Sequence, residues 1–123
     1  MLDQDVFDYI RSQYGIEPDH PFEKHPEITS FRHKDNRKWF GLIMLVSGVK
    51  LGLGTAVVIP VINLKIDDPV FRDMLIQQPG IIRAYHMNKN QWITVFLDGT
   101  VKKERVFDLI DASFMATDRK SVV

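Results

Sequence analysis

The sequence contains no cysteine among its 123 residues. This absence excludes disulfide bonds, thiolate nucleophiles and thiolate metal sites together. Long uncharged stretches are also missing: the two longest, 39–49 and 51–64, are shorter than the ~20 apolar residues that a bilayer-spanning helix needs. The first residues are acidic, whereas a secretory signal begins with basic residues. We therefore expect a cytoplasmic protein with no membrane segment.

Net charge is lacking as well, because 16 Lys and Arg residues balance 16 Asp and Glu residues. The charges are unevenly spread, however. Residues 1–31 hold seven acids and two bases, whereas residues 32–103 hold eleven bases and five acids. Such a distribution either gives the folded protein one positive face or cancels locally where opposite charges interleave, and the sequence leaves both possibilities open.

Length and composition predict one globular domain over residues 1–123, with 45% hydrophobic and 26% charged residues. Periodicity predicts strands over 29–33, 38–46, 57–65, 81–85 and 92–97. Helices are expected over 3–14, 69–78 and 101–117. Their start signals are Asp3, Asp67-Asp68-Pro69 and Asp98-Gly99-Thr100. The Pro-rich stretch 16–27 and the Gly-rich stretch 47–55 are expected to be irregular, and the chain from Asp118 onward to be a frayed tail. This order predicts an α+β fold, an antiparallel β-sheet with helices packed on one face.

Two stretches of the chain have the same design. His33 precedes Trp39 by six residues, and His86 precedes Trp92 by six residues. In both stretches a polar, turn-forming run separates the two rings, and an apolar strand follows the tryptophan. The pattern predicts two similar β-hairpins whose charged tips lie at 34–37 and 87–91.

Basic side chains crowd both predicted tips. Lys and Arg at such tips bind nucleic-acid phosphates by displacing condensed counterions, and the neighbouring amides can reach base edges. The candidate nucleic-acid-binding residues are Arg32, Lys34, Arg37, Lys38, Arg83, His86, Asn88 and Lys89, with DNA as the favoured partner. The competing interpretation is that hairpin tips are polar because they are solvated.

Two further classes of function are open. Tyr85, His86, Trp92 and Trp39 could instead line a concave patch that binds a protein or a small ligand, although such rings ordinarily serve packing. The histidines could supply acid–base groups or metal ligands, but their spacing fixes no geometry. We assign no catalytic residue, cofactor or metal, and we expect His86 to form hydrogen bonds within its own hairpin. The oligomeric state is not predicted.

The second of these stretches resembles a known family. Tyr85-His86-Met87-Asn88-Lys89, Trp92 and Leu97-Asp98-Gly99 resemble the hallmark stretch of the MmcQ/YjbR family, and Asn63-Leu64-Lys65 and 107–114 match it on either side. Arg83, Gln91 and Lys102-Lys103 depart from the usual pattern. The resemblance implies a fold like that of the bacterial frataxin homologue. It also implies DNA binding through two wing-like hairpins, and it implies no catalytic residue set.

Overall fold

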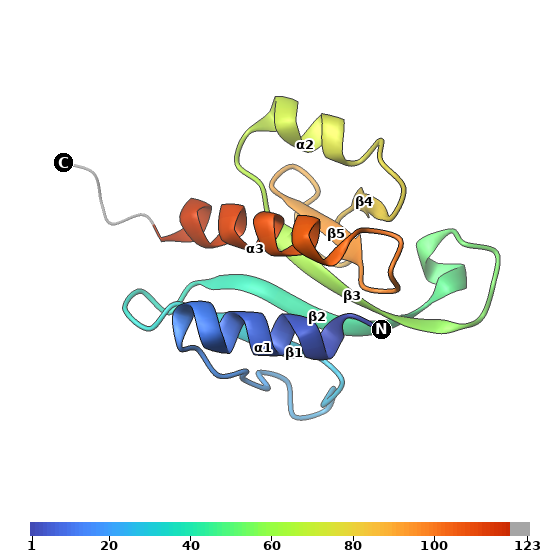
Figure 1. Cartoon of the computed structure of the whole chain (residues 1–123). Coiled ribbons are helices and arrows are strands. Elements are labelled where there is room, and N and C mark those ends of the chain that lie inside the picture. Colours follow the sequence, from blue (N-terminus) through green and yellow to red (C-terminus); the bar gives the residue numbers. More distant parts are fainter. Residues whose placement is uncertain (119–123) are drawn as a thin grey trace.

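Five runs rich in β-branched and aromatic residues pair into one antiparallel sheet. The strands are β1 (Thr29–Arg32), β2 (Trp39–Ser47), β3 (Val58–Lys65), β4 (Ile81–Arg83) and β5 (Trp92–Phe96). They lie in the order β1-β2-β3-β5-β4 (Figure 1). The computed structural model describes residues 1–118, so most of the expected tail lies outside the described residues. The predicted α+β class is confirmed.

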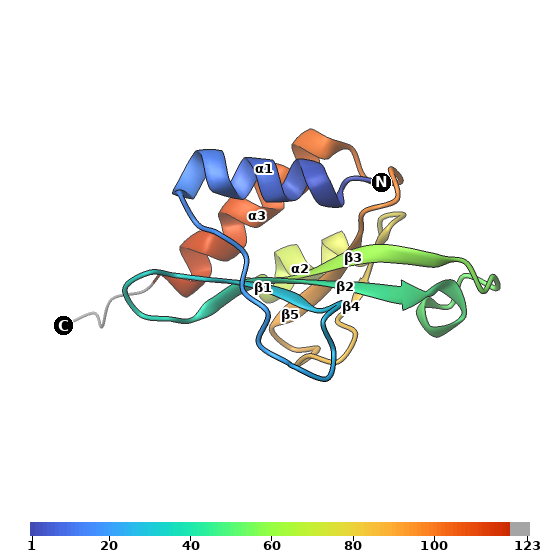
Figure 2. The same ribbon diagram turned by 90° about the horizontal axis from the view of Figure 1, so that it is seen from below.

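Three helices pack against this sheet. They are α1 (Asp3–Tyr14), α2 (Pro69–Leu75) and α3 (Lys103–Thr117); a short 3-10 turn, η1 (Gly48–Leu51), joins β2 to β3. Figure 2 shows α1 and α3 on the same side of the sheet. All three helices contribute to one core with the inward residues of the strands, among them Val6, Ile10, Leu75, Leu109, Ile62 and Ile93. Within residues 1–118, no helix is long and apolar enough to cross a bilayer.

The opposite face of the sheet has no helix from residues 1–118 over it, yet the central strands are apolar there too. A second, smaller cluster on this face comprises Met44, Val46, Leu51, Ile59, Val61 and Phe96. The later part of the loop over 15–28 and the loop over 84–91 lie on this side of the sheet (Figure 2), and Ile28 and Tyr85 pack against the cluster. Loops therefore cover part of a face that the helices leave open.

Two of the expected helix start signals are wrong. Leu2, not Asp3, occupies the N-cap position of α1, and no side chain caps that helix. Asp98 accepts a hydrogen bond from the Thr100 N–H in a local turn, and Lys102 precedes α3 without capping it. An Asp side chain that bonds its own neighbouring backbone satisfies a turn instead of a helix end. The sequence shows which side chains can accept a hydrogen bond from a nearby backbone N–H. It does not show which backbone N–H each of these side chains reaches.

The remaining boundaries follow the expected chemistry more closely. The Asp68 side chain accepts hydrogen bonds from Val70 N and Phe71 N, which confirms it as the cap of α2. That helix ends at Leu75, three residues before the predicted end. Gly15 ends α1 with a φ of 66°, a left-handed conformation that glycine adopts without a steric cost.

Helices α1 and α3 are joined by aromatic stacking and by a shared carboxylate. Tyr9 and Tyr14 of α1 both donate hydrogen bonds to Asp111 of α3. Their rings stack on Phe107 and Phe114, with centroid distances of 4.1 and 3.9 Å. Burial, helped by the hydrogen bond to Asp111, raises the pKa of Tyr9 to about 12, so both phenols stay protonated as donors.

A hydroxyl from α3 is inserted between the two central strands. The regular β2–β3 pairing ends at Leu42 opposite Asn63, and two residues further along the same register would place Phe40 opposite Lys65. Instead, the Ser113 hydroxyl donates to Phe40 O at 2.7 Å and accepts from Lys65 N at 2.8 Å. Ser113 thereby satisfies the two backbone groups that the end of the ladder leaves without partners.

We expect Ser113→Ala to lower the free energy of unfolding by about 2–4 kcal/mol, because both buried backbone groups lose their partner. The measurement is urea unfolding of the variant beside the wild type. Ser12→Ala, at an exposed position of α1, is the matched control and should change stability little. Unchanged stability in S113A would show that Lys65 N then pairs directly with Phe40 O.

Candidate nucleic-acid interface and adjoining groove

Both predicted hairpins exist, and their turns lie at the same end of the sheet. In β1–β2, Arg32 pairs with Trp39 at the turn, and in β4–β5, Arg83 pairs with Ile93 next to Trp92. Strand β3 links the two hairpins, because Lys65 at its end pairs with Trp92. The antiparallel register therefore brings two turns that are distant in the sequence to one edge of the molecule.

A hollow of about 500 Å³ lies at this edge, and we call it the basic hollow. It is lined by Arg32, Arg37, Lys38, Trp39, Lys65, Trp92 and Thr117. The Arg32 guanidinium stacks over the Trp39 ring at 4.9 Å, and its Nε lies 3.5 Å from the Asp19 carboxylate. Among the described residues, the lining thus carries four cations and two indoles but no carboxylate.

The other predicted residues are distributed differently. Lys34 reaches towards the end of α1, with its Nζ 3.4 Å from where a Cβ of Gly15 would lie. Arg83 is opposite Ile93, a residue of the main core, so it belongs to the helix side of the sheet. Lys89 is exposed in the second turn. Three of the eight predicted residues, Arg32, Arg37 and Lys38, line the basic hollow.

Sequence reasoning missed Lys65 because it ends a strand and lies in neither turn. Its position beside Trp92 comes from the β3–β5 register, which the sequence does not state. The spacing between histidine and tryptophan in the two stretches does not point to Lys65. The only sequence hint is a cation that directly follows a run of apolar residues, which is common at strand ends.

Asparagines hold the two turns in similar ways. The Asn36 side chain accepts from Lys38 N at 2.8 Å, and the Asn88 side chain accepts from Asn90 N at 2.9 Å. These are local bonds of the kind that asparagine forms in turns. Each amide oxygen therefore has a partner inside the protein.

The histidines of the two stretches differ. His33 is buried, with Nε2 2.7 Å from the Thr117 hydroxyl and Nδ1 3.6 Å from Asp118. His86 is exposed and its φ is 61°, which is uncommon for a residue with a side chain. Its ring contacts Tyr85 at 4.0 Å, and it forms no side-chain hydrogen bond with residues 1–118, so the hydrogen bond expected in the turn is absent.

One cluster offers ligand atoms for a metal ion. Single atoms of His33, Asp35 and Asp118 lie within 4.8 Å of one another. Nε2 of His33 already has a hydroxyl partner, and the ring and Asp118 form an ion pair whenever the ring is protonated. These contacts account for the cluster, so we assign no metal to it, and the expected absence of a metal stays a prediction.

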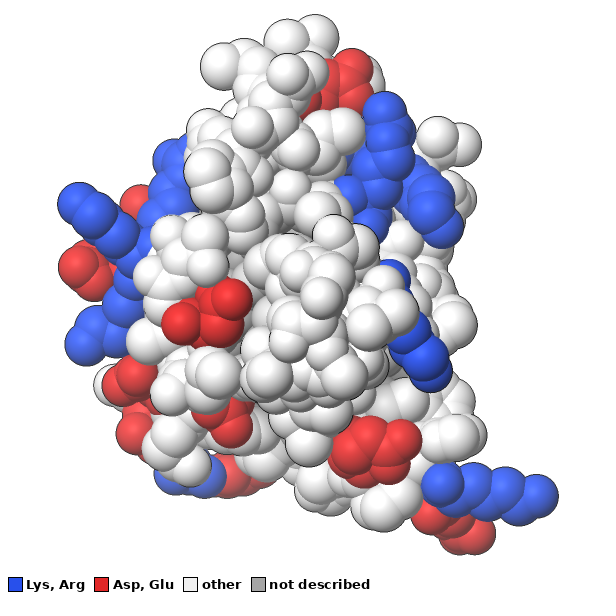
Figure 3. All heavy atoms as spheres, turned by 90° about the vertical axis from the view of Figure 1, so that its right-hand side faces the viewer, with Lys and Arg blue, Asp and Glu red and all other residues white. Residues whose placement is uncertain are grey.

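The acidic residues of the first helix lie away from the basic hollow. Leu2 N donates to Leu97 O, so α1 begins at the end of the sheet opposite the two turns. Figure 3 views the end that bears η1; acidic side chains lie mainly in its lower half, and basic side chains stand towards its two sides. The uneven spread of charge along the sequence is therefore partly kept in the folded protein. Acidic side chains lie at the start of α1, and the basic hollow lies at the other end of the sheet.

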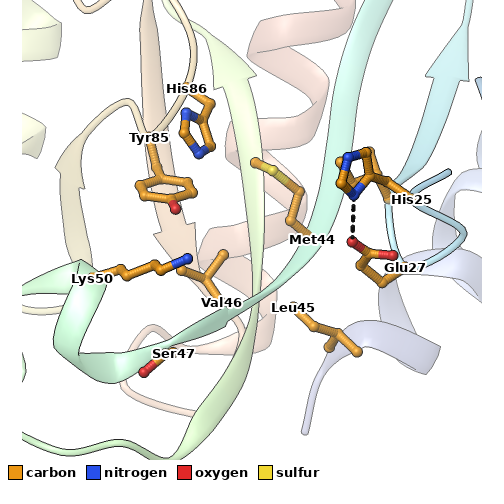
Figure 4. A pocket seen from close by; sticks show the side chains of 10 residues that line it. His25, Glu27, Met44, Leu45, Val46, Ser47, Lys50, Tyr85 and His86 are labelled. Atoms are coloured by element: carbon orange, nitrogen blue, oxygen red, sulfur yellow. Dashed lines mark hydrogen bonds and ion pairs between the residues drawn. The ribbon is translucent and has the colours of Figure 1, made fainter. Parts of the chain in front are cut away.

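A groove adjoins the basic hollow on the face without helices. Its first part, about 250 Å³, is lined by Phe22, Ile28, Trp39, Leu42, Met44, Asn63, His86 and Met87. Its second part, about 290 Å³, is lined by His25, Glu27, Ile28, Met44, Leu45, Val46, Ser47, Lys50, Tyr85 and His86 (Figure 4). The predicted concave patch therefore exists around Trp39, Tyr85 and His86, whereas Trp92 lines only the basic hollow.

Comparisons with known proteins agree with one another. The family model described as YjbR matches residues 11–116. The uncharacterized protein YyaQ of Bacillus subtilis is 40% identical over 114 residues, which cover 93% of this chain and 96% of that protein. The uncharacterized protein YjbR of Escherichia coli K12 is 38% identical over 56 residues, 45% of this chain and 47% of that protein. A crystal structure from Pseudomonas syringae superposes with a TM-score of 0.91 at 42% identity, covering 95% of this chain and 99% of the other.

Protonation of His33 should destabilise the protein. Burial lowers the pKa of its ring from the ordinary value, against the opposing influence of Asp118, so the unfolded chain binds this proton more tightly than the folded protein does. Stability should therefore fall as the pH drops below about 6.5, the ordinary pKa of histidine, and continue falling towards the lowered pKa of the folded state.

Thermal unfolding between pH 7.5 and 5, which spans about one unit or more on either side of the ordinary histidine pKa, measures this loss. His33→Gln should make the melting temperature less dependent on pH in that range. His20→Gln, which changes an exposed histidine, should keep the wild-type dependence. An identical pH dependence of the melting temperature in H33Q and the wild type would contradict the assignment of this loss of stability to His33.

Proposed function

This chain belongs to the YjbR family, and from that premise we propose that it binds nucleic acid, with DNA favoured, through the basic hollow and the two turns beside it. One observation supports the proposal above the others. Four cations from three separate stretches of the chain line a single concavity that no carboxylate of residues 1–118 lines. Phosphates are the anions that such a set of long cationic side chains suits.

The shape of the site supports contact with a sugar–phosphate backbone. Arg37 and Lys38 come from the first turn and Lys65 from the end of β3, so the cations stand on both sides of the hollow. Lys89 extends the site from the second turn, where it is exposed. Contacts of this kind position a strand without reading its sequence, so we expect affinity with little sequence preference.

The zero net charge of the chain sets a limit on affinity. Attraction at long range depends on the whole protein, and the acids near the start of α1 oppose it. Arg32 is also partly neutralised by Asp19. We therefore propose a moderate, salt-sensitive affinity that depends on close contacts in the basic hollow.

The test is fluorescence anisotropy of a labelled DNA duplex, and of one of its single strands, titrated with the protein over a salt series. Four phosphate contacts should give a log–log slope of about −3.6 with duplex, at roughly −0.9 per phosphate. The double variant Lys38→Gln/Lys65→Gln should reduce the steepness by about 1.8 and weaken binding at low salt.

The matched control is Lys102→Gln/Lys103→Gln, which removes the same charge from exposed positions at the start of α3. This control should keep the wild-type slope because these lysines lie outside the hollow. Equal losses in the two double variants would show that only overall charge matters. No detectable binding by the wild type at low salt would refute the proposal.

A further inference from the structure

The groove on the helix-free face has an apolar part and a charged part that share three residues. Ile28, Met44 and His86 line both parts, so the two parts adjoin each other. Residues from 22–28 line one side of the groove and residues from 85–87 line the other, and side chains of strand β2 lie between them. His86 holds its left-handed backbone conformation at the junction, and strained residues of this kind occur disproportionately at ligand sites.

The apolar part is suited to a ring or a branched aliphatic group. Phe22 and Trp39 meet edge to face at 6.1 Å on one side, and Met44 and Met87 contribute flexible thioether side chains. Methionine adapts to irregular shapes and makes favourable sulfur–aromatic contacts. Asn63, the one amide in this lining, is already satisfied, because it donates to Tyr85 O and accepts from Thr94 Oγ1. The apolar part of the groove therefore favours an apolar group of a ligand.

The charged part carries opposite charges on its two walls. Figure 4 shows Lys50 and Tyr85 on one wall and His25 with Glu27 on the other, with Met44 between them. Within residues 1–118, the Lys50 ammonium has no ion-pair partner and the Tyr85 hydroxyl has no hydrogen-bond partner. In the described part of the chain, the Glu27 carboxylate meets only the exposed His25 ring, at 3.2 Å. One wall can thus bind a carboxylate and the other an ammonium group.

We propose that this groove binds a small zwitterion with an apolar side chain, of the kind formed by a hydrophobic amino acid or a very short peptide. Lys50 and Tyr85 bind the carboxylate of this ligand, and Glu27 binds its ammonium group. The apolar part of the groove, beside Trp39, binds the side chain of the ligand. Each contact pairs a ligand group with a protein group that lacks a strong partner, which is where binding gains most.

The size of the groove agrees with this class of ligand. Its parts of about 250 and 290 Å³ are each slightly smaller than the usual range of ligand pockets, ~300–1,000 Å³, and together they fall within it. A purely anionic ligand would meet the Glu27 carboxylate, and a purely cationic one would meet Lys50. A zwitterion satisfies both walls. The inference does not rest on nucleic-acid binding, because none of the four cations of the basic hollow lines the groove.

Isothermal titration calorimetry of the full chain tests the assignment with defined probes. L-Phenylalanine and glycyl-L-phenylalanine carry both charges at two spacings, 3-phenylpropionate lacks the ammonium group, and phenethylamine lacks the carboxylate. Lys50→Gln should weaken binding of both zwitterions and of 3-phenylpropionate about tenfold, and leave phenethylamine unchanged. Glu27→Gln should weaken the zwitterions and phenethylamine, and leave 3-phenylpropionate unchanged or tighter.

Both substituted side chains are exposed, so these variants should fold. Lys103→Gln and Glu104→Gln, exposed at the start of α3, are the matched controls and should bind like the wild type. Met87→Trp should fill the apolar part of the groove and abolish binding of every probe. Failure of both zwitterions to bind the wild type, or binding that neither Lys50→Gln nor Glu27→Gln changes, would overturn the proposal. Tighter binding of 3-phenylpropionate than of both zwitterions would overturn it in favour of an anionic ligand.

Discussion

One hydroxyl from α3 stands between the two central strands of the sheet. Ser113 takes the place of the direct hydrogen bond that would continue the β2–β3 ladder beyond Leu42 and Asn63. From that point β2 leads to the β1–β2 turn, whereas β3 leads to α2 (Figure 1). Trp39 and Lys65 are thereby left on two sides of an opening, and Thr117, one helical turn beyond Ser113, lines it. The basic hollow thus lies where a helix interrupts the sheet.

The second constraint is that β2 and β3 are apolar on both faces while the helices cover one. The uncovered face would expose the cluster of Met44, Val61 and Phe96 if the loops did not fold over it. Two loops from opposite edges of the sheet cover it only in part, and the groove is the space that remains between them. Trp39 separates this groove from the basic hollow and lines both, so one side chain bounds the two candidate sites.

The two stretches that look alike in the sequence serve different purposes in the structure. In both, an asparagine stabilises the turn and a tryptophan begins the next strand. The histidines diverge, because His33 packs beside α3 and is buried, whereas His86 lies in a loop at the rim of the groove and is exposed. Similar local sequence therefore produced similar turns, and the packing partner decided the environment of each ring.

The sequence by itself determined the fold class, the positions of the five strands and the two turns, since these follow from alternating apolar residues and local turn chemistry. It also identified Arg32, Arg37, Lys38 and the rings around His86. Only the tertiary structure decided that Lys65 joins those cations, that Lys34 and Arg83 do not, and that Lys50 and Glu27 face each other across a groove. Strand register and the paths of loops bring together residues up to about sixty positions apart in the sequence, and no local pattern encodes such distant pairings.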